Sequence, residues 1–392
     1  MTCMVCELTV IFSVSAGMGT RLLHRTIRKN YFLRHPLPKP TQKQCMLHRT
    51  FPKPISNLSC EALVYRRHGA FSDVLHLEEV PLFYNGREDI YIRMLAAPVN
   101  PADINMLHGN YGITPCFPAI GGNEGVGEVI KVGCNVNSVK PGDWVIPTDS
   151  GFGTWTTHAV CQAHQVTSIP NNISLISAAT VSVNPCTAYR MLMDFVTLNP
   201  GDTVIQNGAN STVGQAVIQI CSSMGINTIN VIRDRPNVNA LIEKLRSLGA
   251  TYVITEETLQ KQEMADIFKV VERPKLALNC VGGRSAGDLF THLMDGSTMV
   301  TYGGMSRKPT PVPAKAVIFR NIKLYGFWMT QWKKDNLHDV AKIKGMLSDL
   351  IEMVRKGHLL EPACTQIPFK EYETAFHDSL NPCGSKNILI ME

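Results

Sequence analysis

The chain has 392 residues, more than the ~100–200 of a typical single domain, so we expect two domains or one domain with an insertion. Hydrophobic residues make up 44% of the sequence and charged residues 18%, and the 29 Gly and 23 Pro are close to average usage. This composition excludes disordered, collagen-like and low-complexity proteins. The longest apolar stretch, residues 8–18, is about half as long as the ~20 residues of a membrane helix, so no membrane span is expected.

The net charge of +6 is concentrated in the first 56 residues, which hold nine basic residues and one acidic residue. Their net charge of +8 leaves −2 for the rest of the chain, and this gives no electrostatic reason to expect nucleic-acid binding. An Arg-rich, acid-poor leader with interspersed Leu, Ile and Phe predicts a mitochondrial transit peptide over residues 1–56 and a location in the matrix. A disordered basic tail is the alternative.

Twelve cysteines are scattered singly through the sequence, several of them in apolar segments (Cys186, Cys221 and Cys280). This pattern is typical of buried thiols in a reducing compartment rather than of a disulfide framework. Cys3 and Cys6 form a CxxC, but no second pair stands at zinc spacing, so this pair does not predict a metal site.

Between residue 60 and about residue 183, short β-rich runs are separated by Gly and Pro, which predicts an antiparallel, barrel-like domain. From about residue 184, strands alternate with helices, which predicts βαβ units and an α/β fold with a doubly wound parallel sheet. A later helix and a last strand are expected to return to the first domain. The expected runs are 62–65, 89–97, 125–132, 144–147 and 154–160, then strands 203–206, 228–232, 252–254, 276–280 and 298–302 with helices 213–224 and 238–248, and finally helix 340–356 and strand 387–390.

A strand, a turn of small residues and an amphipathic helix follow one another at residues 203–224. The backbone N–H groups and the dipole at such a helix N-terminus favour a pyrophosphate. Only Gly208 and Gly214 remain of a glycine-rich fingerprint, so an ordinary βα turn is an equally good interpretation of this segment alone.

The next expected strand ends in Arg233, Asp234, Arg235 and Pro236. An acidic residue at this strand end would bind a ribose 2′-hydroxyl, whereas arginines suit the 2′-phosphate of NADP, which a guanidinium binds bidentately. The pattern favours NADPH over NADH. A solvated turn that ends at Pro236 is the alternative.

The last strand of this series is followed by Tyr302, Gly303, Gly304 and Met305. Paired glycines at the carboxyl end of a parallel strand allow a ligand to approach the backbone closely, although a plain β-turn uses them too.

Several motifs together resemble those of the medium-chain dehydrogenases/reductases and, within that superfamily, of the mitochondrial trans-2-enoyl-thioester reductases. The resemblance extends from about Cys60 to the end of the chain. It implies a GroES-like antiparallel β-barrel catalytic domain (57–184 and 325–392) and a Rossmann domain that binds NADPH (185–324). The motifs are NPADIN (100–105), GNEGVGEV (122–129), VKPGDWVIP (139–147), NGANSTVGQAVIQI (207–220), VIRDRP (231–236), LNCVGG (278–283), YGGM (302–305) and GFWMTQWKKD (326–335).

Zinc enzymes of this superfamily use a cysteine in the first-domain loop and a histidine before the Glu of a GHE motif. Here the NPADIN loop has no cysteine and Asn123 replaces the histidine. The four-cysteine structural lobe is missing as well. Since both replacements remove ligands that zinc requires, we expect no metal in this reductase.

A 2-enoyl thioester is already activated for hydride addition at its β-carbon, and a proton must then reach its α-carbon. The resemblance implies that Tyr111 is the catalytic residue. A tyrosine is protonated at neutral pH and can donate this proton. Without the resemblance, Tyr111 would be interpreted as a surface or packing residue.

The resemblance also implies a set of residues that contact the cofactor. Phe327 and Trp328 could line an acyl pocket or pack in the core, and Lys386 could be a solvated lysine. Thr212 stands where the family has glycine. The set consists of Asn184, Asn210, Ser211, Thr212, Val213, Arg233, Asp234, Arg235, Tyr302, Gly303, Gly304, Met305, Phe327, Trp328, Met329 and Lys386.

The resulting hypothesis is an NADPH-dependent reduction of trans-2-enoyl thioesters, carried by acyl carrier protein or coenzyme A, in mitochondrial fatty-acid synthesis. We expect a homodimer. One alternative is an NADPH:quinone reductase, which shares the fold and needs no proton donor at Tyr111. The other is a non-catalytic binding protein derived from a reductase, which Thr212 motivates.

Overall fold

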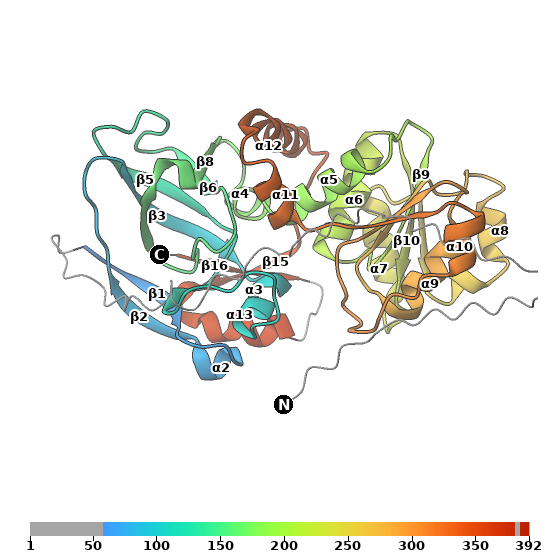
Figure 1. Cartoon of the computed structure of the whole chain (residues 1–392), viewed down its shortest axis with the longest axis horizontal. Helices are drawn as coiled ribbons and strands as arrows, with labels where there is room; N and C mark the ends of the chain where they lie inside the picture. Colours follow the sequence, from blue (N-terminus) through green and yellow to red (C-terminus); the bar gives the residue numbers. More distant parts are fainter. Residues whose placement is uncertain (1–57, 381–384, 392) are drawn as a thin grey trace, which may run out of the picture. The chain divides into compact units, whose positions relative to one another are not determined.

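The computed structural model describes residues 58–380 and 385–391. The expected transit peptide, residues 1–56, lies outside the described residues, as do Cys3 and Cys6. Both domains described below belong to one compact unit (Figure 1).

The first domain is built from two sheets of short strands. The three-stranded sheet has the order β2-β1-β4, and the seven-stranded sheet has the order β15-β16-β3-β5-β6-β8 with β7 paired to β3. The strands are β1 (Ser59–Tyr65), β2 (His76–Pro81), β3 (Asp89–Pro98), β4 (Ala119–Ile120), β5 (Val126–Val132), β6 (Trp144–Pro147), β7 (His158–Gln162), β8 (Val166–Ile169), β15 (Cys364–Pro368) and β16 (Lys386–Ile390). The helices are α2 (Phe71–Val74) and α3 (Pro101–Leu107), with a 3₁₀ turn at Ala163–Gln165.

The expected return of the C-terminal segment to the first domain is confirmed. β16 pairs antiparallel with β3, with Ile388 opposite Pro98. β15 and β16 pair parallel instead, because the chain crosses between them through α13 (Tyr372–Leu380) and such a crossover joins parallel strands. The domain is therefore not antiparallel throughout.

The expected strand over residues 154–160 is wrong in its first half. Residues 154–157 run as irregular backbone before β7, and the buried Trp155 ring donates its Nε1–H to the carbonyl of Pro98. The backbone of Trp155 also accepts a hydrogen bond from Leu63. These contacts hold the segment across the end of β1, where an alternating pattern alone gives no warning of a bend.

The second domain contains the parallel sheet that the sequence predicts. The sheet has six strands in the order β11-β10-β9-β12-β13-β14, and β14 was not among the expected strands. The strand order reverses between β9 and β12, and sheets of this class bind their ligands outside the carboxyl ends of the strands at such a point. β14 pairs with β13 as far as Gly326, two residues beyond the expected domain boundary. The strands are β9 (Thr203–Asn207), β10 (Asn227–Ile232), β11 (Tyr252–Thr255), β12 (Leu276–Asn279), β13 (Thr298–Thr301) and β14 (Lys323–Gly326).

Helices cover both faces of this sheet (Figure 1), which explains why β9 is buried along its whole length. They are α6 (Thr212–Ser223), α7 (Val238–Ser247), α8 (Glu263–Ile267), α9 (Gly283–His292) and α10 (Ala314–Phe319). Two further 3₁₀ turns lie at Thr258–Gln260, before α8, and at Phe369–Glu371, before α13. No helix in the described part of the chain is long and apolar enough to cross a membrane.

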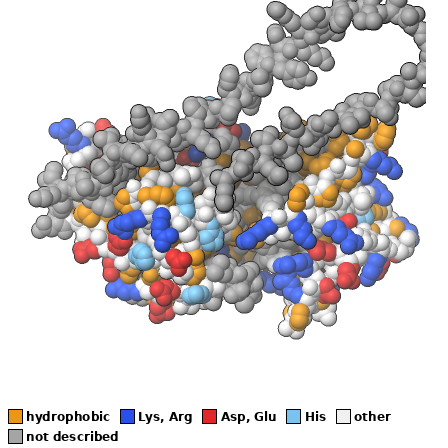
Figure 2. All heavy atoms as spheres, turned by 60° about the horizontal axis from the view of Figure 1, so that its bottom comes forward, with side chains coloured by type: hydrophobic (Ala, Val, Ile, Leu, Met, Phe, Trp, Pro, Cys, Tyr) orange, Lys and Arg blue, Asp and Glu red, His pale blue; other side chains and the backbone are white. Residues whose placement is uncertain are grey.

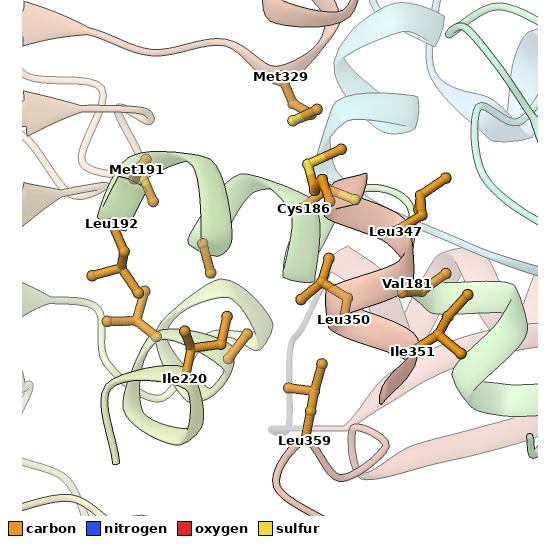
Figure 3. Close-up of a cluster of buried hydrophobic side chains, with 14 of the residues drawn as sticks. Val181, Cys186, Met191, Leu192, Ile220, Met329, Leu347, Leu350, Ile351 and Leu359 are labelled. Carbon is orange, nitrogen blue, oxygen red and sulfur yellow. The ribbon is translucent and has the colours of Figure 1, made fainter. Parts of the chain in front are cut away.

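A single hydrophobic cluster joins the two domains (Figure 3). It combines strand residues of both domains with side chains of five helices, among them Cys186, Ile220, Met329 and Leu350. Cys186, Cys221 and Cys280 are buried thiols, as predicted. The helices at this junction, besides α6, are α4 (Leu175–Thr180), α5 (Asn184–Asp194), α11 (Met329–Asp335) and α12 (Val340–Arg355).

Candidate active site

The NPADIN motif forms the start of α3. Asn100 caps the helix and Pro101 occupies the first turn, while the Asp103 carboxylate accepts a hydrogen bond from the Asn100 backbone at 2.7 Å. This reciprocal cap satisfies N–H groups that a helix start would otherwise leave unpaired. The cap therefore fixes Asn100 and Asp103, both buried, at one point beside the barrel.

Asn123 occupies the position at which the zinc enzymes have histidine. Its Nδ2 donates to Asp103 Oδ1 at 2.6 Å, and its Oδ1 accepts from the backbone N–H of Gly151 at 2.6 Å. Both polar ends of the amide are therefore used within the protein. Within residues 58–380 and 385–391, no group of three or more His, Cys, Asp or Glu side chains is arranged to hold a metal ion.

Glu124 is fully buried and lies at the centre of a second set of hydrogen bonds. Its carboxylate accepts from Asn100 Nδ2 at 2.9 Å and from the backbone N–H of Val183 at 2.7 Å. Asn100 Oδ1 accepts from Lys386 Nζ and from Asn184 Nδ2. We call Asn100, Asp103, Asn123, Glu124 and Lys386 the polar cluster.

Lys386 has 8% of its surface exposed, so its interpretation as a solvated lysine is wrong. Burial lowers the pKa of Lys386, and the carboxylates of Glu124 and Asp103 oppose that shift. Burial also raises the pKa of Asp103 to about 6, against the hydrogen bonds that it accepts from Asn100 and Asn123. Two acids and one lysine thus share a buried site, where opposite charges stabilise one another.

Tyr111 lies half-buried beside α11, in contact with Trp328. The indole Nε1–H donates to the Tyr111 hydroxyl oxygen at 2.7 Å, and the two rings meet edge to face at 5.5 Å. A Cβ on Gly112 would lie 2.7 Å from the Trp328 ring, so glycine after Tyr111 permits this close contact. Burial raises the pKa of Tyr111, which keeps the phenol protonated at neutral pH.

The turn between β9 and α6, which we call the cofactor turn (208–214), is shaped by backbone rather than by large side chains. Gly208 has φ of 60°, and a Cβ on Gly214 would lie 2.6 Å from the carbonyl oxygen of Ala209. Ser211 is the N-cap of α6, with Oγ accepting from the N–H of Gly214, and Thr212 is the first helical residue. Asn210 and Val213 flank this pair. The cradle fits a dinucleotide pyrophosphate.

The YGGM motif lies at the carboxyl end of β13, opposite the cofactor turn. Burial raises the pKa of Tyr302 well above its ordinary value, and the side chain lies against Cys280 and Ser211. A Cβ on Gly303 would lie 2.9 Å from the carbonyl oxygen of Cys280, so a side chain is excluded there. Gly304 and Met305 are exposed. These residues follow β13, which neighbours β12 at the point where the strand order reverses.

Arg233 and Asp234 are exposed and Arg235 is half-buried, immediately after β10. The Arg235 backbone N–H donates to the Asp234 carboxylate at 2.9 Å, so Asp234 helps to hold the backbone of this turn. The two arginines follow β10, the strand that pairs with β9, and in sheets of this class this strand end is where the adenosine ribose of a dinucleotide is bound.

The side chains of the consecutive residues Phe327, Trp328 and Met329 have different surroundings in the structure. Phe327 packs edge to face against Phe195 at 6.0 Å, and Met329 is buried in the hydrophobic cluster (Figure 3). Trp328 alone contacts Tyr111. Core packing is therefore the observed role of Phe327 and Met329 side chains, whereas Trp328 belongs to the site.

Reasoning from the sequence missed Asn100, Asp103 and Glu124 as parts of the site. Their motifs were recognised as carriers of the family resemblance and as signs that zinc ligands are absent, but none of the three was assigned to the site. The available signal was the presence of two acids and an amide in two motifs of the same domain, because charged groups that become buried require partners.

A barrel-like domain completed by a C-terminal strand, joined to a dinucleotide-binding sheet, defines the medium-chain dehydrogenase/reductase class. Residues 86–171 match the family described as alcohol dehydrogenase GroES-like domain, and residues 212–344 match the family described as zinc-binding dehydrogenase. The chain is 53% identical to the mitochondrial enoyl-acyl-carrier-protein reductase of Xenopus tropicalis over 345 residues, which cover 88% of this chain and 99% of the relative.

Solved structures agree with this assignment. The Etr1p complex with NADP and crotonyl-CoA has a TM-score of 0.79 and 34% identity over 85% of this chain and all of the other. The Etr1p/Etr2p heterodimer of 2-enoyl thioester reductases from Candida tropicalis gives 0.78 and 34% over the same shares. The chain belongs to the family of mitochondrial enoyl-acyl-carrier-protein reductases.

Proposed function

We propose that the protein reduces trans-2-enoyl thioesters to saturated acyl thioesters with NADPH, in mitochondrial fatty-acid synthesis, and that Tyr111 supplies the proton. The family assignment supports the reaction, and the hydrogen bond between Trp328 and Tyr111 is the observation that supports the proton donor. When bound, NADPH supplies the hydride that is added to the β-carbon of the substrate.

The direction of the Trp328 hydrogen bond determines what Tyr111 can do. Because the indole donates to the phenol oxygen, the phenol hydrogen remains available for another acceptor. The indole also stabilises negative charge on that oxygen once the proton has left. Tyr111 can therefore deliver a proton to the α-carbon, and Trp328 is suited to assist that transfer.

The cofactor is proposed to lie between the cofactor turn and the polar cluster. Ser211, Thr212 and the N–H groups of the first turn of α6 would hold the pyrophosphate. Arg233 and Arg235 would bind the 2′-phosphate that distinguishes NADPH. Asn184, held by Asn100 of the polar cluster, would orient the carboxamide of the nicotinamide.

A solved relative contains crotonyl-CoA, so a coenzyme A thioester is the first substrate to test here, and acyl carrier protein is the proposed alternative carrier. The face shown in Figure 2 carries Lys and Arg side chains among Asp and Glu. Charge on this face does not by itself select one carrier, which leaves the choice to an assay.

NADPH oxidation with crotonyl-CoA, with crotonyl-acyl carrier protein and with a quinone tests the proposal directly. We expect turnover of the thioesters and little turnover of the quinone. Quinone reduction with no thioester reduction would favour the quinone reductase alternative, and no turnover of any substrate would favour a binding protein.

We further propose that a second copy of this chain pairs along β14. All four residues of this last strand of the described sheet are exposed, as are Ile318 (68%) and Phe319 (77%) of the preceding α10. An exposed edge strand beside apolar side chains is a typical association surface.

Light scattering should show a dimer for the wild type and a monomer for the double variant Ile318→Glu with Phe319→Glu. The control is Val270→Glu, which changes an equally exposed apolar side chain and should leave the dimer intact.

A further inference from the structure

Three hydroxyl groups lie in a row from Tyr111 toward the surface of the barrel domain. The Thr330 hydroxyl lies close enough to Tyr111 to oppose the rise in the pKa of the phenol, and Thr330 Oγ1 forms a hydrogen bond with Ser150 Oγ at 2.8 Å. Thr330 has 4% of its surface exposed, whereas Ser150 is half-buried and the next residue, Gly151, is exposed. The row begins at the proposed proton donor and ends where solvent reaches the protein.

Ser150 and Thr330 are each held in place by contacts outside this row. The Gly151 N–H donates to Asn123 Oδ1 at 2.6 Å, and Asn123 in turn donates to Asp103. Thr330 lies in the first turn of α11, directly after Met329, which is anchored in the hydrophobic cluster. Asn123, the residue that replaces a zinc ligand, thus positions the loop that carries Ser150.

We infer that Thr330 and Ser150 form a proton relay that returns a proton to Tyr111 after each turnover. The inference rests on the proposed function, since it presumes that Tyr111 donates its proton to the substrate.

The transfers balance without any further reactant. The O–H bond of Tyr111 breaks as a C–H bond forms at the α-carbon, which leaves a phenolate. Thr330 gives its hydroxyl proton to the phenolate and takes one from Ser150, which takes one from water. No electrons are exchanged with an oxidant or reductant in these steps. The transfers are concerted, because an isolated alkoxide at the buried Thr330 would be strongly unfavourable.

The relay is useful because of the surroundings of Tyr111. One side of the phenol is covered by the Trp328 ring. An acyl thioester placed for protonation covers another side and keeps bulk water from the phenolate. A hydroxyl both donates and accepts, so a row of hydroxyls can carry a proton where water is excluded.

Ser150→Ala is the most direct test, because Ser150 contacts Thr330 and not Tyr111. Each enzyme molecule starts with a protonated Tyr111, so in stopped-flow kinetics with crotonyl-CoA the first turnover should proceed at the wild-type rate. Later turnovers should be slower by about tenfold, which appears as a burst of NADPH oxidation. Thr148→Val is the matched control, since Thr148 pairs with Thr167 in the same region but does not reach Tyr111; no burst is expected.

Thr330→Val should show the same burst, and Thr330→Ser, which keeps the hydroxyl, should remove it. A Ser150→Ala enzyme whose later turnovers match the wild type would overturn the relay. So would a Thr330→Val enzyme in which the first turnover is slowed as much as the later ones, because Thr330 would then only orient Tyr111.

Tyr111→Phe separates the relay from the function on which it rests. If Tyr111→Phe is fully active, the proton donor is wrong and the relay fails with it. If Tyr111→Phe is slow from the first turnover while Ser150→Ala shows no burst, Tyr111 remains the donor and the relay alone is rejected.

Discussion

The cofactor turn and the polar cluster solve different problems with different parts of the chain. In the cofactor turn, backbone N–H groups and small residues form the site, and Gly214 is needed because its neighbour Ala209 leaves no room for a Cβ. In the polar cluster, side chains from segments nearly 300 positions apart meet, with Lys386 bonded to Asn100. A site formed by the backbone, such as the cofactor turn, tolerates side-chain changes that do not add bulk toward it. A site formed by side chains, such as the polar cluster, requires particular residues.

The largest effect is expected at Tyr111, in the half of the site that depends on side chains. Tyr111→Phe removes one hydroxyl and should lower kcat by about 10²-fold or more, while the Kd of NADPH stays nearly unchanged. Because the pKa of Tyr111 is raised by burial, wild-type kcat should fall on the alkaline side only above the ordinary tyrosine value of ~10. Full activity of the variant on an enoyl thioester would reject Tyr111 as donor.

The next effect concerns cofactor preference. Arg233→Ala with Arg235→Ala should weaken NADPH binding about 10- to 100-fold and NADH binding much less, since the two cofactors differ only in the 2′-phosphate. Fluorescence titration with both cofactors measures this difference. Arg246→Ala, which removes an exposed arginine of the nearby α7, serves as the control for net charge. An equal loss for both cofactors would make the arginines general steering charges.

A smaller effect is expected at Gly214. A Cβ there would lie 2.6 Å from the Ala209 carbonyl oxygen, so Gly214→Ala should displace the cofactor turn and weaken NADPH binding about tenfold, or ~1.4 kcal/mol. Gly345→Ala in α12 is the matched control, because a Cβ meets nothing within 4 Å there; it should leave binding unchanged and stabilise the helix slightly. Equal affinities for both variants would mean that the turn does not need glycine.

The smallest effect is expected at Thr212. As the first residue of α6, just after the N-cap Ser211, Thr212 adds bulk beside N–H groups but offers a hydroxyl to a phosphate oxygen. The wild type should therefore bind NADPH, and Thr212→Gly should change the affinity by no more than about tenfold. Absence of binding by the wild type, with recovery in Thr212→Gly, would support the binding-protein alternative.

The sequence predicted the parallel sheet well because its signals are local. β9, β10 and β11 are short apolar runs between helices of regular period, and each was found within two residues. β2 was missed because it is only partly buried, with the acidic pair Glu78 and Glu79 in its middle. β15 was missed for a similar reason, since its residues are mostly exposed.

From the sequence, only those site residues that lie within recognisable motifs could be predicted. Tyr111 was identified through the family resemblance and the cofactor turn first through its strand–turn–helix pattern, whereas the bond between Ser150 and Thr330 joins residues 180 positions apart. No pattern in either segment indicates the other, because the contact depends on how α11 packs against the barrel. Buried polar residues can be recognised in a sequence, but their partners follow from the fold.

The pairing of β16 with β3 has a consequence for the order in which the polar cluster is assembled. A chain emerges from the ribosome with its N-terminus first, so Asn100 and Glu124 are made long before Lys386. Until residues 386–390 join β3, Glu124 and Asp103 lack the lysine that offsets their charge. The polar cluster is therefore completed last, after both domains have been synthesised, and a chain interrupted before β16 would carry the cofactor turn without Lys386 in the polar cluster.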